Sequence, residues 1–176
     1  MAEEQNPPRG DGEANGAAAP EGEVQFAIQK IYVKDLSFEA PAAPEIFRSP
    51  RWEPEINLQL NSEARRLEGP LYEVVMTLTL TASQDGKTVY LVELQQAGIF
   101  HIAGIEGPDL GAVLGAHCPA ILFPYAREAI SDLVTRGGFP QMLLAPINFD
   151  AVYQESLRQR QQQAAGGEEP GAAQPH

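Results

Sequence analysis

The chain has 176 residues, a net charge of −12 at neutral pH and a single cysteine, Cys118. One cysteine excludes an intrachain disulfide framework, and no apolar run approaches the roughly 20 residues that a membrane-spanning helix needs. The acidic balance disfavours nucleic acid as a partner, because phosphate binding requires a basic face. We therefore expect an acidic, cytoplasmic protein with one domain.

Both ends of the chain have a composition typical of disorder. Residues 1–23 are rich in glycine, alanine, proline and glutamate, and they lack the apolar stretch of a signal peptide. Residues 159–176 are similarly poor in large apolar side chains. Neither segment buries enough apolar surface to offset its ordering entropy. We predict two disordered tails on either side of one domain at 24–158.

The first predicted strand, at residues 24–38, changes the phase of its alternation twice. Its apolar residues fall into three sets of alternating parity: Val24, Phe26 and Ile28; Ile31 and Val33; Leu36 and Phe38. Either a β-bulge shifts the register of this strand, or both of its faces are partly covered.

A long loop follows this strand. The segment 39–54, EAPAAPEIFRSPRWEP, contains four prolines, which remove backbone donors and disfavour both a helix and a central strand. We predict a proline-rich crossover loop between the first two strands. It carries two large apolar side chains, Phe47 and Trp52.

Three further strands are predicted from the two-residue period. Alternating apolar residues at 56–60 and at 74–80 indicate antiparallel strands with one buried face. The pair Asp85-Gly86 accepts positive φ and predicts a hairpin turn at 84–87. The returning strand of this hairpin is expected at 88–96.

The rest of the domain has the period of helices. One helical face is formed by Ala126, Ala129, Ile130, Leu133 and Val134. Pro124 suits the first turn of this helix, and the pair Gly137-Gly138 suits its end. A second helix, with Asn148 as its N-cap, places Phe149, Val152, Tyr153 and Leu157 along one stripe. The sequence predicts an α+β fold in which two helices follow a four-stranded antiparallel sheet.

The sequence contains no pattern of catalytic residues. The three histidines and Cys118 lack the spacing of a zinc site, and the apolar neighbours of Cys118 favour a buried, unreactive thiol. Gly98 and Gly104 lack the spacing of a phosphate-binding loop. We predict a protein that uses no cofactor and is not an enzyme.

Large apolar side chains are numerous for so small a domain: Phe38, Phe47, Trp52, Phe123, Tyr125, Phe139, Phe149 and Tyr153. Each one alone is explained by a place in the core. Together they exceed what one four-stranded sheet and two helices can hide. The excess predicts a subunit interface or a binding groove.

Three segments, in order along the chain, carry a resemblance to a known family: IYVKDLSFEAPAAP, LVELQQAGIFHIAGIEG and HCPAILFPYAREAISDLVTRGGFPQMLLAPINFDAVY. From Phe26 to Tyr153 the chain resembles SecB, the bacterial protein-export chaperone. The resemblance implies a homotetramer, a dimer of dimers, that holds unfolded precursor proteins without ATP. It also implies delivery of these precursors to SecA, the motor ATPase of the export channel, without insertion of the chaperone into the membrane.

The resemblance further assigns roles to residues. The positions that match the SecA-binding surface are Asp35, Glu39, Leu91 and Glu93, and strand parity independently places the members of each pair on one face. The positions assigned to precursor binding are Phe47, Trp52, Phe139, Phe149 and Tyr153. The resemblance places Val92, Leu94 and Gln96 near the subunit contacts.

Two other hypotheses stay open. A SecB-like chaperone dedicated to a toxin–antitoxin pair has the same fold and no role in export. A small-molecule enzyme or carrier needs a closed pocket with convergent polar groups, and no pattern in the sequence indicates one.

Overall fold

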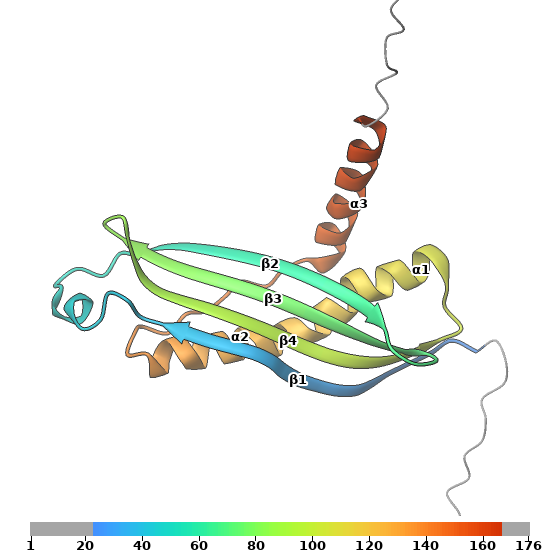
Figure 1. Cartoon of the computed structure of the whole chain (residues 1–176), viewed down its shortest axis with the longest axis horizontal. Helices are drawn as coiled ribbons and strands as arrows, with labels where there is room; N and C mark the ends of the chain where they lie inside the picture. Colours follow the sequence, from blue (N-terminus) through green and yellow to red (C-terminus); the bar gives the residue numbers. More distant parts are fainter. Residues whose placement is uncertain (1–22, 167–176) are drawn as a thin grey trace, which may run out of the picture.

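Four antiparallel strands followed by helices make up the computed structural model, which describes residues 23–166. The strands are β1 (Gln25–Glu39), β2 (Glu55–Arg66), β3 (Leu71–Gln84) and β4 (Lys87–Ala103). They form one sheet in the order β1-β4-β3-β2 (Figure 1). The predicted α+β fold is confirmed. Residues 40–54 connect β1 to β2, which lie at opposite edges of the sheet.

The double phase change of β1 comes from two bulges. In the pairing with β4, Gln29 and Lys34 each stand outside the one-to-one register. Each extra residue reverses the alternation once, so the bulge alternative is the correct one. The second bulge places Asp35 opposite Gln95 of β4, the position that a regular strand would give to Lys34.

The hairpin between β3 and β4 turns at two residues with positive φ, Asp85 at 54° and Gly86 at 74°. This matches the predicted turn. β4 runs on to Ala103, beyond the expected end at residue 96. The strand continues through Gly98, which pairs with Ile31 and Val74. Glycine is required at this position because a Cβ would be 2.8 Å from the ring of Phe100.

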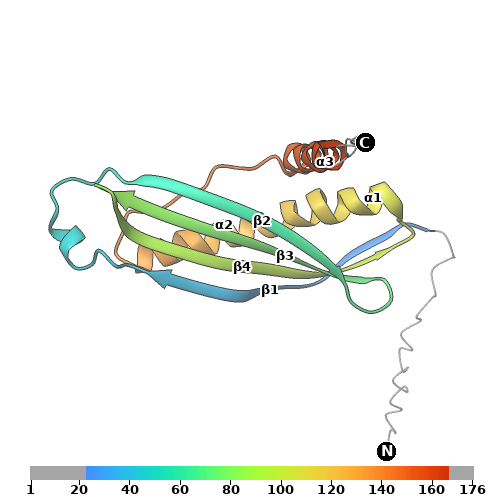
Figure 2. The same ribbon diagram turned by 45° about the horizontal axis from the view of Figure 1, so that its top comes forward.

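One face of the sheet carries the core. Its buried strand residues are Tyr72, Val74, Met76, Leu78, Leu80 and Ala82 of β3, and Tyr90, Val92, Leu94, Gln96, Phe100 and Ile102 of β4. The helix α2 (Cys118–Arg136) lies across this face (Figures 1 and 2). Each Å² of apolar surface removed from water here contributes about 25 cal/mol. The opposite face of the sheet is uncovered by any other part of the described chain (Figure 1).

The first helical run begins earlier than the sequence predicted. It consists of α1 (Gly107–Ala112), a π-helical turn (Val113–His117) and α2. Pro124 therefore lies inside α2 and not in a first turn, which corrects the prediction. A proline in a helix interior costs about 3 kcal/mol. The buried apolar face of α2, which packs against the sheet, offsets this cost. Such packing cannot be predicted from the local sequence pattern.

The helix α2 ends at Arg136, directly before the glycine pair Gly137-Gly138, as predicted. Gly138 has φ of 86°, its N–H bonds the carbonyl of Thr135, and the N–H of Phe139 bonds the carbonyl of Val134. These two bonds form a Schellman motif. The motif turns the chain sharply and directs Phe139 back toward the sheet.

The last helix, α3 (Phe149–Gly166), starts as predicted. Asn148 caps it, because its side-chain oxygen accepts the N–H of Ala151 at 3.0 Å. The helix continues past the expected domain end at residue 158. Glu155 accepts a hydrogen bond from Gln159, and the surrounding straight-chain residues favour a helix whatever their burial. The remaining parts of the predicted tails, 1–22 and 167–176, lie outside the described residues.

Candidate binding surfaces

The uncovered face of the sheet brings the four predicted SecA-binding positions together. Glu39 lies opposite Leu91, and Asp35 lies opposite Gln95, two residues along β4 from Glu93. The three acidic residues are exposed and Leu91 is half-buried. We call Asp35, Glu39, Leu91 and Glu93 the acidic patch.

The acidic patch is not neutralised by its surroundings. Within residues 23–166, none of its carboxylates forms an ion pair. Its neighbours on β3 are uncharged: Thr79 lies opposite Glu93, and Thr81 lies opposite Leu91. Three negative charges around one apolar side chain complement a basic segment that also carries an apolar residue.

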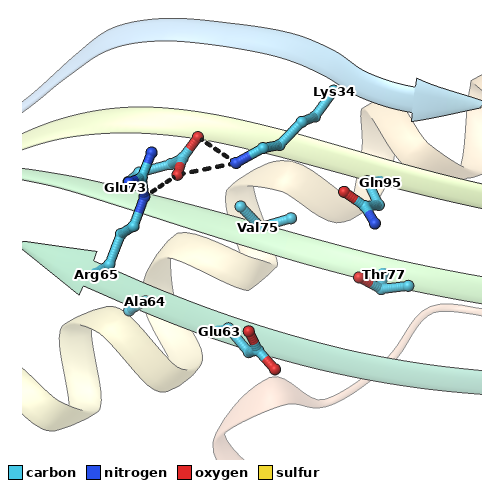
Figure 3. Close-up of a pocket in the computed structure, with 8 residues that line it drawn as sticks. All are labelled: Lys34, Glu63, Ala64, Arg65, Glu73, Val75, Thr77 and Gln95. Atoms are coloured by element: carbon cyan, nitrogen blue, oxygen red, sulfur yellow. Dashed lines mark hydrogen bonds and ion pairs between the residues drawn. The ribbon is translucent and has the colours of Figure 1, made fainter.

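Further along the same face, the buried carboxylate of Glu73 on β3 accepts hydrogen bonds from side chains of β1 and β2 (Figure 3). The ammonium of Lys34 donates to both oxygens of Glu73, at 2.9 and 3.1 Å, and Arg65 Nε donates at 2.5 Å. The hydroxyl of Tyr32 donates to the same carboxylate. We call Tyr32, Lys34, Arg65 and Glu73 the Glu73 cluster. Sequence reasoning missed it.

Electrostatics keeps Glu73 ionised. The hydrogen bond from Tyr32 is the largest influence, and with the bonds from Arg65 and Lys34 it outweighs burial and lowers the pKa of Glu73 to about 2. The same hydrogen bond raises the pKa of Tyr32. An open depression of about 350 Å³ beside the cluster has charged and polar residues such as Glu63, Thr77 and Gln95 in its lining. Small-molecule pockets are predominantly apolar, so this depression does not favour the enzyme or carrier hypothesis.

Three of the predicted precursor-binding residues meet in one group of aromatic rings. Phe139 is the centre, with its ring centroid 5.0 Å from that of Phe47 and 5.5 Å from that of Trp52. Phe38 and Tyr90 complete the group from the sheet, the latter 4.8 Å from Phe139. We call these five residues the aromatic cluster. Sequence reasoning did not connect Phe38 and Tyr90 with the crossover loop. Phe38 lies just before the loop in the sequence, whereas Tyr90 comes close to it only because β4 pairs with β1 in the sheet.

The exposed fraction of the side chains differs widely within the aromatic cluster. Phe139 is 4% exposed, whereas Phe47 of the crossover loop is 52% exposed. The hydroxyl of Tyr90 is buried without a hydrogen-bond partner among the described residues, and burial raises its pKa. The cluster therefore presents an apolar rim on a buried aromatic base.

The other two predicted precursor-binding residues lie elsewhere. Phe149 is buried and packs edge-on against Phe123 of α2, with centroids 5.5 Å apart. Tyr153 lies over Gly111 and Gly115 of the first helical run, where a Cβ on Gly115 would be 2.5 Å from the tyrosine ring. Both residues attach α3 to that run, so they are separate from the aromatic cluster.

The three positions predicted near the subunit contacts, Val92, Leu94 and Gln96, are buried within the single chain. Val92 and Leu94 have no exposed surface in the single chain, and Gln96 is 3% exposed. All three face α2, because β4 directs these positions toward the helices. Gln96 also donates a hydrogen bond to the carbonyl of Tyr32 at 3.0 Å. All three therefore belong to the core of the single chain.

The thiol of Cys118 is buried, as the sequence predicted. Cys118 is fully buried, and burial raises the pKa of its thiol to about 12. Residues 23–166 contain no group of three metal-ligating side chains. No helix of this part of the chain is both long and apolar enough to cross a bilayer.

Comparison with known proteins places the chain in a family. The family model described as preprotein translocase subunit SecB matches residues 19–160. The protein-export protein SecB of Marinobacter nauticus is 53% identical over 83% of this chain and 88% of its own. That of Pseudomonas putida is 52% identical over 91% of this chain and 97% of its own. That of Thioalkalivibrio sulfidiphilus is 48% identical over 94% of this chain and 99% of its own.

Among solved structures, a SecB-like chaperone of Mycobacterium tuberculosis in complex with a ChAD peptide from an antitoxin has the same fold. Its TM-score is 0.57 at 18% identity, over 69% of this chain and 87% of that one. An identity this low supports the fold alone.

Proposed function

This chain belongs to the SecB family of protein-export chaperones, and from this membership we propose that it holds unfolded precursor proteins without ATP and delivers them to SecA. The observation that carries the proposal is the identity of about half of all residues to SecB proteins over most of the chain. We propose a cytoplasmic location, in keeping with this role, and no nucleic-acid partner.

Precursor binding is proposed at the aromatic cluster. Unfolded chains expose apolar side chains, and the half-exposed Phe47 and the partly exposed Trp52 form an apolar rim that these side chains can contact. Phe139 supports both rings from below. Phe149 and Tyr153 contribute to precursor binding indirectly, since they fix α3.

Delivery is proposed at the acidic patch. Its charges lie on the uncovered sheet face, where electrostatic complementarity to a basic segment of SecA would set the rate of encounter. The aromatic cluster is built from the crossover loop, the end of α2 and the helix-facing side of the sheet. The two surfaces share no residue, and we propose that a precursor and SecA can be bound at the same time.

A homotetramer, arranged as a dimer of dimers, is the proposed assembly. Support comes from the edge strand β1, where Ile28, Val33 and Leu36 are 48%, 48% and 39% exposed although they point to the helix-facing side. Isolated exposed apolar residues are ordinary, but three on one edge strand form a continuous apolar strip. A second copy would cover this strip.

The proposal is tested by refolding of a slow-folding secretory precursor. Stoichiometric chaperone without ATP is expected to delay the recovery of native precursor, measured by its fluorescence. Phe47→Ser should shorten the delay, whereas Leu67→Ser, an exposed apolar residue in the turn between β2 and β3, serves as the matched control. An absent delay, or a delay that requires ATP, would contradict the proposal.

The toxin–antitoxin alternative has weaker support. It rests on the fold shared with the Mycobacterium tuberculosis chaperone at 18% identity, whereas the identity to SecB export proteins is about 50%. Binding of an antitoxin peptide together with no measurable binding of SecA would favour this alternative.

A further inference from the structure

The face on which Asp35 lies is decided by the bulge at Lys34. In a regular strand, Lys34 would lie opposite Gln95, and Asp35 would lie opposite Leu94 on the helix-facing side. Leu94 is fully buried there, so a carboxylate beside it would lose much of its hydration. In a strand of this sequence, Asp35 therefore joins the acidic patch only while Lys34 stands outside the register.

Side chains hold this bulge from both faces of the sheet. On the uncovered face, Tyr32 and Lys34 reach across β4 to Glu73 of β3. Tyr32 lies opposite Ala97 of β4, whereas Glu73 lies opposite Ile99, so these bonds run diagonally across β4 and pass the small side chain of Ala97. On the other face, Gln96 donates to the carbonyl of Tyr32 at 3.0 Å.

Glu73 has a strong requirement for these donors. Its side chain is 4% exposed, whereas those of Lys34 and Arg65 are 39% and 67% exposed. The two cations therefore keep contact with water, while the carboxylate depends on protein donors for its solvation. A shift of β1 that removed the bulge would withdraw the ammonium of Lys34 from a buried negative charge.

We propose that Glu73 is a positioning residue for the partner-binding face: it holds Tyr32 and Lys34, locks the bulge in β1, and so turns Asp35 outward into the acidic patch. The identity of the partner rests on the proposed function, but the effect on strand geometry does not. Arg65 contributes by neutralising the second oxygen of Glu73 from β2 (Figure 3).

The test compares substitutions in the full-length, assembled protein. Glu73→Gln removes the central charge, and Lys34→Met removes the ammonium at the bulge. Glu63→Gln is the matched control, because Glu63 is an exposed carboxylate beside the same depression and bonds to Asn61. Tyr32→Phe, which deletes a single hydroxyl, carries the test if Glu73→Gln does not fold.

Two readouts separate positioning from charge. Amide hydrogen exchange at residues 33–37 should accelerate by about tenfold in the Glu73 and Lys34 variants, with no change at the distant Asp85-Gly86 turn. SecA affinity should fall by about tenfold in both variants, although one makes the face less negative and the other more negative. Glu63→Gln should change neither readout.

The outcomes are distinguishable. Affinities that move in opposite directions in the Glu73→Gln and Lys34→Met variants would show a charge effect alone and overturn the proposal. Unchanged exchange at residues 33–37 would also overturn it. If the wild-type protein does not bind SecA, the proposed function fails at that partner, while the exchange data still decide whether Glu73 locks the bulge.

Discussion

Among single residues, the acidic patch offers the most direct test of delivery. Reversing Asp35, Glu39 and Glu93 to lysine should abolish most SecA binding, because attraction to a basic segment becomes repulsion. Exposed positions of this kind change the free energy of unfolding by about 0.5 kcal/mol or less. Holding of precursors should persist, since the aromatic cluster contains none of these residues. Titrations with SecA and with an unfolded precursor measure the two activities separately.

The control for this triple reversal is Glu63→Lys, which reverses a charge elsewhere on the same face. Wild-type SecA binding is also expected to weaken as salt rises, because exposed charges are screened. Equal loss of both activities in the triple variant, or retention of both, would contradict the assignment of the patch.

Glu73 makes stability depend on acid pH. The pKa of this carboxyl is about 2 in the folded chain, against an ordinary value of 4.5. The group therefore stabilises the fold above pH 4.5, and this contribution is lost as the pH falls toward 2. Its full size is about 3 kcal/mol at most. Urea unfolding at pH 7, 5, 4 and 3 measures this effect. As the pH falls, the free energy of unfolding should decline less for Glu73→Gln than for the wild type. Equal declines in the two proteins would contradict this.

The two surfaces differ in how far the sequence predicts them. Alternation within single strands is enough to pair Asp35 with Glu39, and Leu91 with Glu93. Glu73 has the same outward parity as Val75 and Thr77 of β3, and no feature of the local sequence indicates that it is buried. Its burial arises from donors on β1 and β2, which reach it through the strand order of the sheet. That order is a tertiary property.

For whole elements, the attachment of α3 depends on a glycine. Gly115→Ala would place a Cβ 2.5 Å from the ring of Tyr153 and should destabilise the docking of α3 by about 1–3 kcal/mol. The opposing gain in helix propensity is about 1 kcal/mol. Hydrogen exchange in α3 measures the effect, and the sheet should remain unchanged.

A second substitution isolates the steric part of this effect. Tyr153→Leu removes the ring, so Gly115→Ala should become neutral or stabilising in that background. A loss of the same size in both backgrounds would show that the clash is not the cause.

Element boundaries show why local patterns predict some features and miss others. Asn148 and the pair Gly137-Gly138 act through their own backbone and capping bonds, so their roles could be read from the sequence. Pro124 could not be placed in this way, because a proline is tolerated in a helix interior only when packing offsets its cost. The position of Phe139 depends equally on tertiary packing.

The whole molecule is expected to be a tetramer in solution at low micromolar concentration. Val33→Asp should weaken assembly while the subunit stays folded, because Val33 is 48% exposed on β1. Val92→Asp should instead unfold the subunit, since it would bury a charge in the core, at a cost well above 1 kcal/mol. Light scattering and circular dichroism distinguish the two results. A stable wild-type monomer would contradict the proposed assembly.

The two bulges of β1 also bear on insertions and deletions. Deleting Gln29 would leave every other residue of the strand opposite its present partner, because Gln29 stands outside the register. Deleting Tyr32 would exchange the faces of the neighbouring residues. Deleting Lys34 would keep the pairing but remove a cation from Glu73. Natural length variation within this strand should therefore concentrate at position 29, and a Gln29 deletion variant should unfold at nearly the wild-type temperature.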